Sequence, residues 1–177
     1  QIKVIVDAGH GGKDSGAIGS SGLKEKDITL DIGLLLQKII LEKGEGIFKP
    51  LLTRVEDKYL SLEERVMFAN QSEGDIFISL HVNSSQSKKD SGFEVYYNAI
   101  SSDESAKEVA DRENISVEEK KDSKEESSPM FILWDLAQNE FLKESGYFAD
   151  TIQNSIDVTF NKSEHKTFAI KNRGVKQ

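Results

Sequence analysis

Short apolar runs punctuate the first half of the chain and predict strands. Residues 2–6 (IKVIV) are almost entirely β-branched and apolar, which is typical of a strand that is covered on both faces of a parallel sheet. Buried or short strands are also expected at 75–82 and at 50–54. At 93–97 every second residue is apolar or aromatic, which predicts a half-exposed strand.

Helical periodicity separates these strands. A stripe of isoleucine and leucine from 28 to 39 predicts a helix with Asp27 as its N-cap and Gly44 as its stop. Ser61 and Glu64 have the spacing of a capping box, which predicts a second helix over about 62–72. Strand, helix, strand, helix, strand is the order of an α/β fold. We therefore expect one domain with a twisted, largely parallel central sheet and helices on both faces.

The second half of the chain has weaker patterning. Residues 103–113 predict a helix, whereas 117–128 are charged without periodicity and predict a solvated segment. The other elements expected here are a helix introduced by Ser128 and Pro129 and carrying apolar residues to 141, a last helix at about 145–160, and a strand beginning at 168–170.

Composition narrows the class of protein. The 177 residues suffice for one domain with a buried core. The formal net charge of -8 argues against a nucleic-acid binder, and no apolar run approaches the roughly 20 residues of a membrane span. The chain has no cysteine, which excludes disulfides, thiolate ligands and a cysteine nucleophile. Because it opens directly on a strand, without a signal peptide, we expect a mature or excised domain.

Two histidines and a glutamate form the candidate chemistry. His10 and His81 each follow a predicted buried strand, and Glu25 follows a glycine-rich loop. In a parallel sheet the carboxyl ends of the strands meet where ligands bind. Two imidazoles and one carboxylate, with a fourth position open for water, are the ligand set of a hydrolytic zinc site. The pattern predicts such a site, which suits zinc but would accept other divalent ions.

Simpler explanations compete with parts of this site. A single histidine after a strand is more often a hydrogen-bonded loop residue than a ligand, but two in equivalent places beside a glycine-rich loop favour the metal site. Glu25 alone is a weak candidate, because Glu94 is as plausible by residue type. Glu63 and Glu64 also qualify by type, although helix capping and surface exposure explain them better.

Other residues are candidates for the surroundings of the metal. Asp7 could accept a hydrogen bond from a ligating imidazole or cap the loop. Asn83 and Arg173 could lie near the metal or line the cleft. Arg65 is expected to be a structural ion-pair partner. His165 is expected in an exposed loop, and Trp134 in the core.

The candidate ligands lie in longer motifs. VDAGHGGKDSGAIGSSGLKEKD resembles the opening signature of the zinc-dependent N-acetylmuramoyl-L-alanine amidases of the amidase-3 type. The resemblance continues in order through LTRVEDKYLSLEERVMFAN, ISLHVNSS and SGFEVYY, and then through KEVADREN, ILWDLAQ and NRGVKQ. These motifs are long, ordered and spread over nearly the whole chain.

The resemblance implies a cell-wall hydrolase. Such enzymes cleave the amide between the lactyl group of N-acetylmuramic acid and L-alanine of the peptidoglycan stem peptide. It implies zinc held by His10, Glu25 and His81, and a role in wall remodelling and daughter-cell separation. Because the substrate lies outside the cytoplasmic membrane, the protein is expected in the periplasm or at the cell surface.

The resemblance also implies two features at the edges of the motifs. The family's general acid or base is a glutamate in a block of the type VEXGFxSN, which we expect beyond Gln177. The domain at 1–177 is therefore expected to lack its C-terminal strand and helix. In the cell-division branch of the family, an inserted element near 103–128 can cover the zinc until an activator partner displaces it. Here a flexible surface loop is the simpler explanation.

Two alternative functions stay open at this stage. A domain without the second glutamate could bind the cell wall or regulate another enzyme without turnover, since general acid–base catalysis commonly contributes about 10² to 10⁴ in rate. A carboxypeptidase-like zinc peptidase could use a similar ligand set.

Overall fold

The computed structural model describes residues 1–82, 92–97, 129–162 and 171–176. The chain divides into two compact units, Gln1–Gln86 and Ser87–Gln177, and each is described by itself. The elements predicted at 103–113, 117–128 and 168–170, the candidates Asn83 and His165, and the side chain of Trp134 lie outside the described residues.

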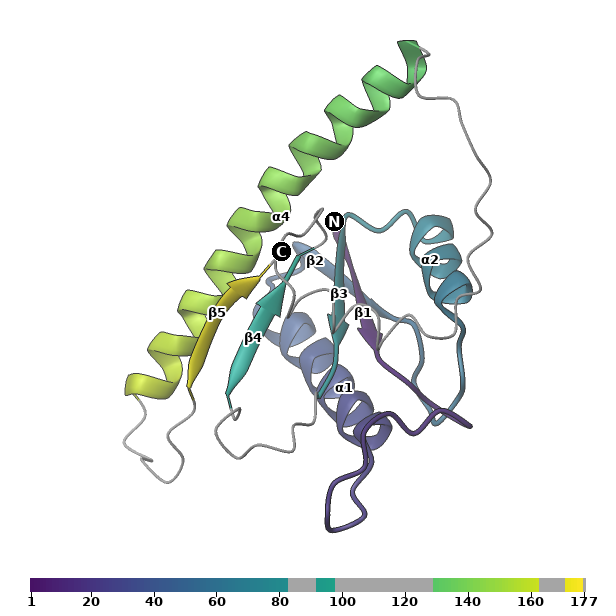
Figure 1. The fold of residues 1–177 in the computed structure, drawn as a ribbon, viewed down its shortest axis with the longest axis vertical. Coiled ribbons are helices and arrows are strands. Elements are labelled where there is room, and N and C mark those ends of the chain that lie inside the picture. The colour runs from purple at the N-terminus through teal and green to yellow at the C-terminus, as the bar shows by residue number, and fades with distance from the viewer. Residues whose placement is uncertain (83–91, 98–128, 163–170, 177) are drawn as a thin grey trace. The chain divides into compact units, whose positions relative to one another are not determined.

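A three-stranded parallel sheet organises the first unit, in the order β2-β1-β3 (Figure 1). The central strand β1 pairs with both neighbours, so that Val4 lies between Pro50 and Ile76. Parallel neighbours need crossover connections, which the two helices provide. The elements are β1 (Ile2–Ala8), α1 (Glu25–Lys43), β2 (Phe48–Leu52), α2 (Leu62–Gln71) and β3 (Ile76–Leu80).

The two faces of β1 pack differently. Val4 and Val6 are buried together with Leu52, and Leu36 and Ile40 of α1 pack against them. Ile5 is fully buried on the opposite face. There a hollow is lined by Ile5 and Phe77 of the sheet and by Val66 and Ala69 of α2. The predicted α/β class, with a parallel sheet and helices over both faces, is confirmed for this unit.

The start of α1 differs from the prediction. The N-cap is Lys24 in an extended conformation, with no side-chain cap, so Asp27 lies in the first turn instead. The loop before the helix supplies the missing acceptors, because Glu25 N donates to Ala17 O at 2.8 Å and Lys26 N to Ser15 O at 3.2 Å. Backbone carbonyls therefore replace a capping side chain. The helix ends at Gly44, as predicted.

The remaining boundaries of the first unit are close to those predicted. Ser61 and Glu64 form the expected capping box, with Glu64 N donating to Ser61 Oγ at 3.2 Å and Ser61 N to Glu64 Oε2 at 2.7 Å. The second strand begins and ends two residues earlier than expected, so Arg54 lies beyond it. The third strand ends at Leu80, which leaves His81 outside the ladder.

The second unit contains a parallel strand pair and one long helix. Strands β4 (Phe93–Tyr96) and β5 (Asn172–Lys176) pair with an irregularity between Phe93 and Val95. The helix α4 (Pro129–Lys162) contacts both strands. All four residues of β4 are partly buried, so the predicted alternation of exposure is absent.

The prediction of two separate helices between 129 and 160 is wrong, because α4 is continuous over 34 residues. Gly146 lies inside it, and a glycine costs a helix about 1 kcal/mol relative to alanine. The ring of Tyr97 lies against this glycine, since a Cβ on Gly146 would be 3.5 Å from Cζ of Tyr97. Among the described residues, no helix has the length and apolar character needed to cross a membrane.

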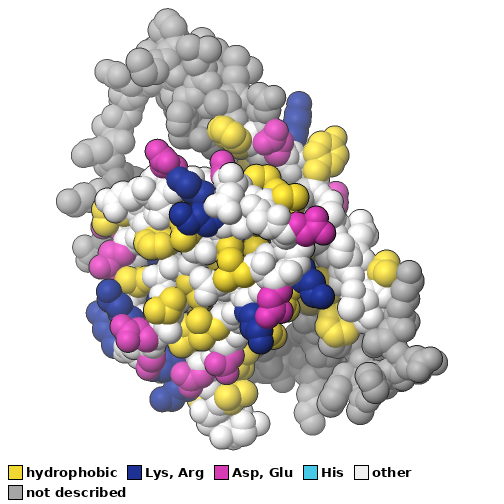
Figure 2. Space-filling view, turned by 180° about the vertical axis from the view of Figure 1, so that it is seen from behind, with side chains coloured by type: hydrophobic (Ala, Val, Ile, Leu, Met, Phe, Trp, Pro, Cys, Tyr) yellow, Lys and Arg dark blue, Asp and Glu magenta, His cyan; other side chains and the backbone are white. Residues whose placement is uncertain are grey.

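The surface seen in Figure 2 mixes hydrophobic, basic and acidic side chains. Acidic, basic and exposed hydrophobic side chains are interspersed, and no large area of one charge sign dominates the described residues on that face. Several leucines and isoleucines of α1 contribute exposed apolar surface, including Ile32, Leu35 and Ile39.

We expect Ile5→Ala to lower the free energy of unfolding by about 2–5 kcal/mol, because it empties a fully buried position in the central strand. Urea unfolding followed by circular dichroism measures this loss. Leu35→Ala is the matched control, since Leu35 is exposed on α1. Equal losses in the two variants would contradict the assignment of Ile5 to the core.

Candidate metal centre

The two histidines leave the sheet from neighbouring strands. Gly9 N donates to Leu80 O at 3.1 Å, which ties the end of β1 to the end of β3. A Cβ on Gly9 would lie 2.6 Å from Cε1 of His81, so only glycine lets the imidazole lie there. His10 has a φ of 60°, a left-handed conformation that a non-glycine residue adopts rarely. This geometry turns the His10 ring towards His81.

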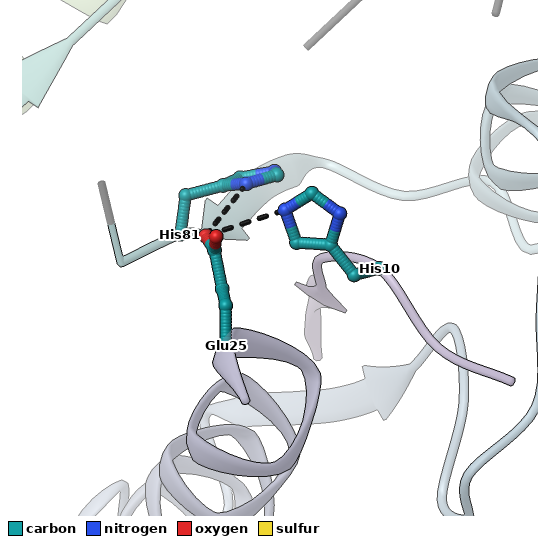
Figure 3. A group of neighbouring side chains, drawn as sticks. All are labelled: His10, Glu25 and His81. Carbon is teal, nitrogen blue, oxygen red and sulfur yellow. Dashed lines mark ion pairs between the residues drawn. The ribbon is translucent and has the colours of Figure 1, made fainter. Parts of the chain in front are cut away.

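Glu25 approaches both imidazoles from the first residue of α1 (Figure 3). Its Oε1 lies 3.3 Å from Nε2 of His10 and 3.3 Å from Nδ1 of His81. One ligand atom from each of the three side chains lies within 4.8 Å of the others. The Glu25 side chain is 4% exposed, that of His10 12% and that of His81 28%. The structure thus brings the three predicted ligands together, with His81 on the side open to solvent.

Backbone amides hold the Glu25 carboxylate in place. Val82 N donates to Oε1 at 2.6 Å and Ala17 N donates to Oε2 at 2.9 Å. Burial opposes ionisation of Glu25, but the hydrogen bonds from His10, His81 and these amides outweigh it and keep the pKa well below its usual range. The carboxylate therefore stays charged at neutral pH.

The same contacts act on His10 in the opposite direction. The hydrogen bond with Glu25 raises the pKa of His10 above its ordinary value, burial opposes this rise, and the hydrogen bond with Asp14 adds to it. A buried negative charge facing two imidazoles is an environment that favours a cation. The arrangement can hold a proton or a divalent metal between the three side chains.

The backbone of Gly16 packs directly against the side chains of His10 and Glu25. Its φ is 61°, and a Cβ there would lie 2.6 Å from Cδ2 of His10 and 2.8 Å from Oε2 of Glu25. The glycine-rich loop is therefore needed for the close approach of the backbone to the candidate ligands.

Asp7 does not reach an imidazole, contrary to one of the predictions for it. Its carboxylate is buried and accepts from Arg65 Nη1 at 2.6 Å, from Thr53 Oγ1 at 2.7 Å and from Ser79 Oγ at 2.8 Å. All three partners are side chains, so among the described residues no backbone amide of the loop is capped by Asp7. The predicted role of Arg65 as an ion-pair partner is confirmed, and its Nη2 also donates to His10 O at 2.9 Å.

Arg54 is a buried residue of the site that the sequence analysis missed. Its Nε donates to Ala8 O at 2.8 Å, and its Nη2 donates to Gly9 O at 2.9 Å and to Lys26 O at 2.8 Å. One guanidinium therefore joins the segment before His10 to the start of the helix that carries Glu25. An arginine as the last residue of the short strand predicted at 50–54 was the available signal.

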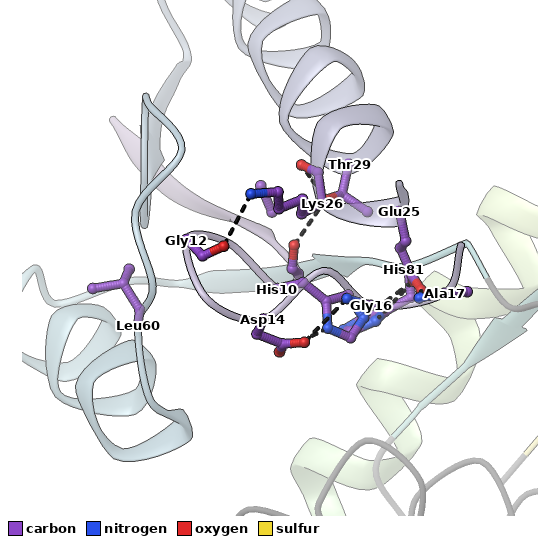
Figure 4. A network of polar contacts seen from close by, with 12 residues as sticks. His10, Gly12, Asp14, Gly16, Ala17, Glu25, Lys26, Thr29, Leu60 and His81 are labelled. Atoms are coloured by element: carbon purple, nitrogen blue, oxygen red, sulfur yellow. Dashed lines mark hydrogen bonds and ion pairs between the residues drawn. The ribbon is translucent and has the colours of Figure 1, made fainter. Parts of the chain in front are cut away.

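A second set of polar contacts holds the glycine-rich loop from outside (Figure 4). Lys26 Nζ donates to Gly12 O at 2.9 Å and to Asp57 Oδ2 at 2.6 Å, and Gly12 N donates to Asp57 Oδ1 at 2.7 Å. Within the loop, Asp14 Oδ2 lies 2.9 Å from Nδ1 of His10. The sequence analysis missed all three side chains, although the four-residue spacing of His10 and Asp14 inside a loop was visible.

The remaining candidates take other roles. Glu94 lies in the second unit, where its Oε1 lies 2.6 Å from Nε of Arg173 and 3.8 Å from Nζ of Lys176. Glu64 serves the capping box of α2, as expected. Among the described residues, His10, Glu25 and His81 are the group of histidine and acidic side chains whose ligand atoms could share one metal.

An α/β domain with two imidazoles and a carboxylate at the edge of a parallel sheet belongs to the class of candidate metallohydrolases. Residues 4–177 match the Amidase_3 family, described as N-acetylmuramoyl-L-alanine amidase, and the chain belongs to this family. The resemblance inferred from the sequence motifs is confirmed.

Individual relatives agree with this membership. The chain is 45% identical over 95 residues to the sporulation-specific N-acetylmuramoyl-L-alanine amidase of Bacillus subtilis, covering 54% of this chain and 35% of that protein. It is 38% identical to the structure of the catalytic domain of CwlV, an N-acetylmuramoyl-L-alanine amidase from Bacillus (Paenibacillus) polymyxa var. colistinus, with a TM-score of 0.52 over 56% of this chain and 55% of that one.

A third comparison supports the fold over almost the full length. The crystal structure of an N-acetylmuramoyl-L-alanine amidase from Clostridium difficile 630 superposes with a TM-score of 0.62, covering 98% of this chain and 68% of that one at 23% identity. The chain spans half or less of the length of the first curated relatives it matches, with shares of 40%, 35% and 50%.

We expect Arg65→Ala to lower the free energy of unfolding by about 3–5 kcal/mol, because it leaves the Asp7 carboxylate buried without its cation. Urea unfolding measures the loss. Glu73→Ala is the control, since it removes the exposed ion pair with Lys3 and should change stability little. A loss for Arg65→Ala no larger than that of the control would contradict the account.

Proposed function

We propose that this chain is part of a zinc-dependent N-acetylmuramoyl-L-alanine amidase, which hydrolyses the amide between N-acetylmuramic acid and L-alanine in peptidoglycan. The observation that carries the proposal is the convergence of His10, Glu25 and His81 in a chain of the Amidase_3 family. The names of the relatives support the choice of amide bond, and the donor set supports hydrolysis at a metal.

The donor atoms fit zinc. Two imidazole nitrogens and one carboxylate oxygen are the protein ligands of many hydrolytic zinc sites, with a fourth position left for water or substrate. Glu25 is ionised in advance, because two backbone amides and the two nearby imidazoles stabilise its charge. When bound, zinc would polarise the amide carbonyl and activate a water molecule. The partly exposed side of His81 leaves an approach for the substrate from solvent.

The proposed substrate has consequences for where the protein acts. Peptidoglycan lies outside the cytoplasmic membrane, so we place the activity in the periplasm or at the cell surface, in wall remodelling and the separation of daughter cells. The partner is a glycan strand with its stem peptide. An activator protein acting on residues 103–128 is a further proposal, and it concerns a segment outside the described residues.

Hydrolysis of defined muropeptides tests the proposal. Full-length protein loaded with zinc should release stem peptides that begin with L-alanine, as identified by mass spectrometry, and chelator should abolish the release. Glu25→Gln should abolish both zinc uptake and hydrolysis because it removes a charged ligand. Glu63→Gln, on the exposed side of α2, is the matched control and should behave as wild type.

The products decide between this function and its alternatives. A cut between two amino acids would leave the lactyl amide intact and indicate a carboxypeptidase-like peptidase. Stoichiometric zinc and binding to insoluble sacculi without released peptide would indicate a wall-binding or regulatory domain. Zinc uptake is measured separately from hydrolysis, since metal binding does not depend on a general acid or base.

We expect zinc affinity to fall as the pH is lowered. A ligating imidazole must be neutral, and Glu25 raises the pKa of His10 above 6.5, so protons begin to compete with the metal above that pH. Affinity should be constant well above the raised pKa and fall by about tenfold per pH unit below it for each proton displaced. Competition with a chromophoric chelator between pH 8 and pH 5 measures the effect. Constant affinity over this range would contradict the proposed ligand set.

A further inference from the structure

Within the proposed zinc site, we propose that Asp14 is a positioning residue that selects the ligating nitrogen of His10. It holds the proton of His10 on Nδ1, so that Nε2 faces the metal, whereas His81 offers Nδ1. The inference rests on the proposed function, because it concerns the orientation of a ligand for the proposed zinc. Neither the motif nor the family membership states which nitrogen each histidine uses.

The argument begins with the two nitrogens of the His10 ring. Nδ1 lies 2.9 Å from Oδ2 of Asp14, whereas Nε2 lies 3.3 Å from Oε1 of Glu25 on the other side of the ring. An ionised carboxylate can only accept a hydrogen bond, so Nδ1 must donate to Asp14. A metal that binds at Nε2 displaces the proton that this nitrogen shares with Glu25, while the proton on Nδ1 stays on Asp14. The lone pair that is freed on Nε2 points into the cluster.

His81 presents its other nitrogen to the same carboxylate. Its Nδ1, not its Nε2, lies 3.3 Å from Oε1 of Glu25. The two rings meet edge to face, with centroids 4.9 Å apart and an angle of 81° between their planes. The two histidines therefore differ in how they would bind the metal, and each needs its own means of orientation. The structure supplies Asp14 for His10.

Asp14 is itself held in place within the loop. Its Oδ1 accepts from Gly16 N at 3.0 Å, while its backbone exchanges hydrogen bonds with Gly11 at 2.9 and 3.1 Å. Gly16 in turn packs against Cδ2 of His10, as the missing space for a Cβ there shows. The His10 ring is thus confined between a carboxylate on its Nδ1 edge and backbone on another edge (Figure 4).

A second carboxylate, from the segment between β2 and α2, also anchors the glycine-rich loop and so separates positioning of His10 from simple anchoring of the loop. Asp57 accepts from Gly12 N and from Lys26 Nζ, and so also holds the glycine-rich loop, but among the described residues no hydrogen bond or ion pair joins it to His10. The two side chains have similar exposure, 44% for Asp14 and 50% for Asp57. If the carboxylates served the loop alone, removing either one would have comparable effects on metal binding.

The experiment compares Asp14→Ala, Asp14→Asn and Asp57→Ala in the full-length protein at pH 7.5. Zinc affinity is measured by chelator competition, and long-range ¹H–¹⁵N NMR of the zinc-saturated protein reports which nitrogen of His10 carries the proton. We expect Asp14→Ala to weaken zinc binding by about 10–100-fold and to move the His10 proton away from Nδ1. Asp14→Asn keeps an acceptor oxygen and should recover part of the affinity. Asp57→Ala should keep the Nδ1–H tautomer and bind zinc much more tightly than Asp14→Ala.

The outcomes separate this inference from the proposed function. If wild-type protein takes up no zinc, the proposed function fails. Two results would overturn the role of Asp14 and leave the proposed function standing. In the first, Asp14→Ala binds zinc as tightly as wild type and keeps the proton of His10 on Nδ1. In the second, Asp57→Ala loses as much zinc affinity as Asp14→Ala. Urea unfolding of each variant shows whether the substitution lowers its stability. Zinc affinities are then compared without denaturant, where each variant is folded.

Discussion

The buried carboxylate of Glu25 is the interaction on which the rest of the site depends. It accepts from Ala17 N in the loop and from Val82 N just beyond β3, and it lies 3.3 Å from a nitrogen of each imidazole. A single negative charge thereby draws together three segments that are far apart in the sequence. Burying a charge is costly unless its lone pairs are satisfied, and here each oxygen has partners. The same charge makes the group selective for a cation.

Two buried arginines hold the backbone segments on either side of the Glu25 carboxylate. Arg65 neutralises Asp7 and holds the His10 carbonyl, while Arg54 joins the Gly9 carbonyl to that of Lys26. Neither guanidinium touches the candidate ligands through their side chains. Their donors satisfy the carbonyls where the chain leaves β1 and enters α1, and planar guanidinium groups suit such multiple contacts. A loop with a left-handed histidine is therefore held by charge-assisted hydrogen bonds rather than by an apolar core.

Local patterns predicted the first unit well and the environment of the site poorly. The apolar run at 2–6, the Ser61–Glu64 capping box and the Gly44 stop depend on neighbours in the sequence, and the structure has all three. The positions of His10 and His81 followed from the rule that strand ends share an edge. Asp7 and Asp14 could not be told apart by spacing, because the choice depends on Arg65, which comes from a distant helix. The start of α1 was also predicted wrongly, because carbonyls of the preceding loop accept from its first amides in place of a capping side chain. The continuity of α4 depends on its contacts with β4 and β5, which come before and after it in the sequence.

The most direct test of the account is the zinc K-edge X-ray absorption spectrum of the metal-loaded protein. The account predicts one zinc per chain with a first shell of nitrogen and oxygen at about 2.0–2.2 Å and the multiple scattering of two imidazoles. Loss of one oxygen scatterer or of the metal in Glu25→Gln would complete the assignment. A protein that takes up no zinc, or a spectrum without imidazole scattering, would contradict the claim that these three side chains form one metal centre.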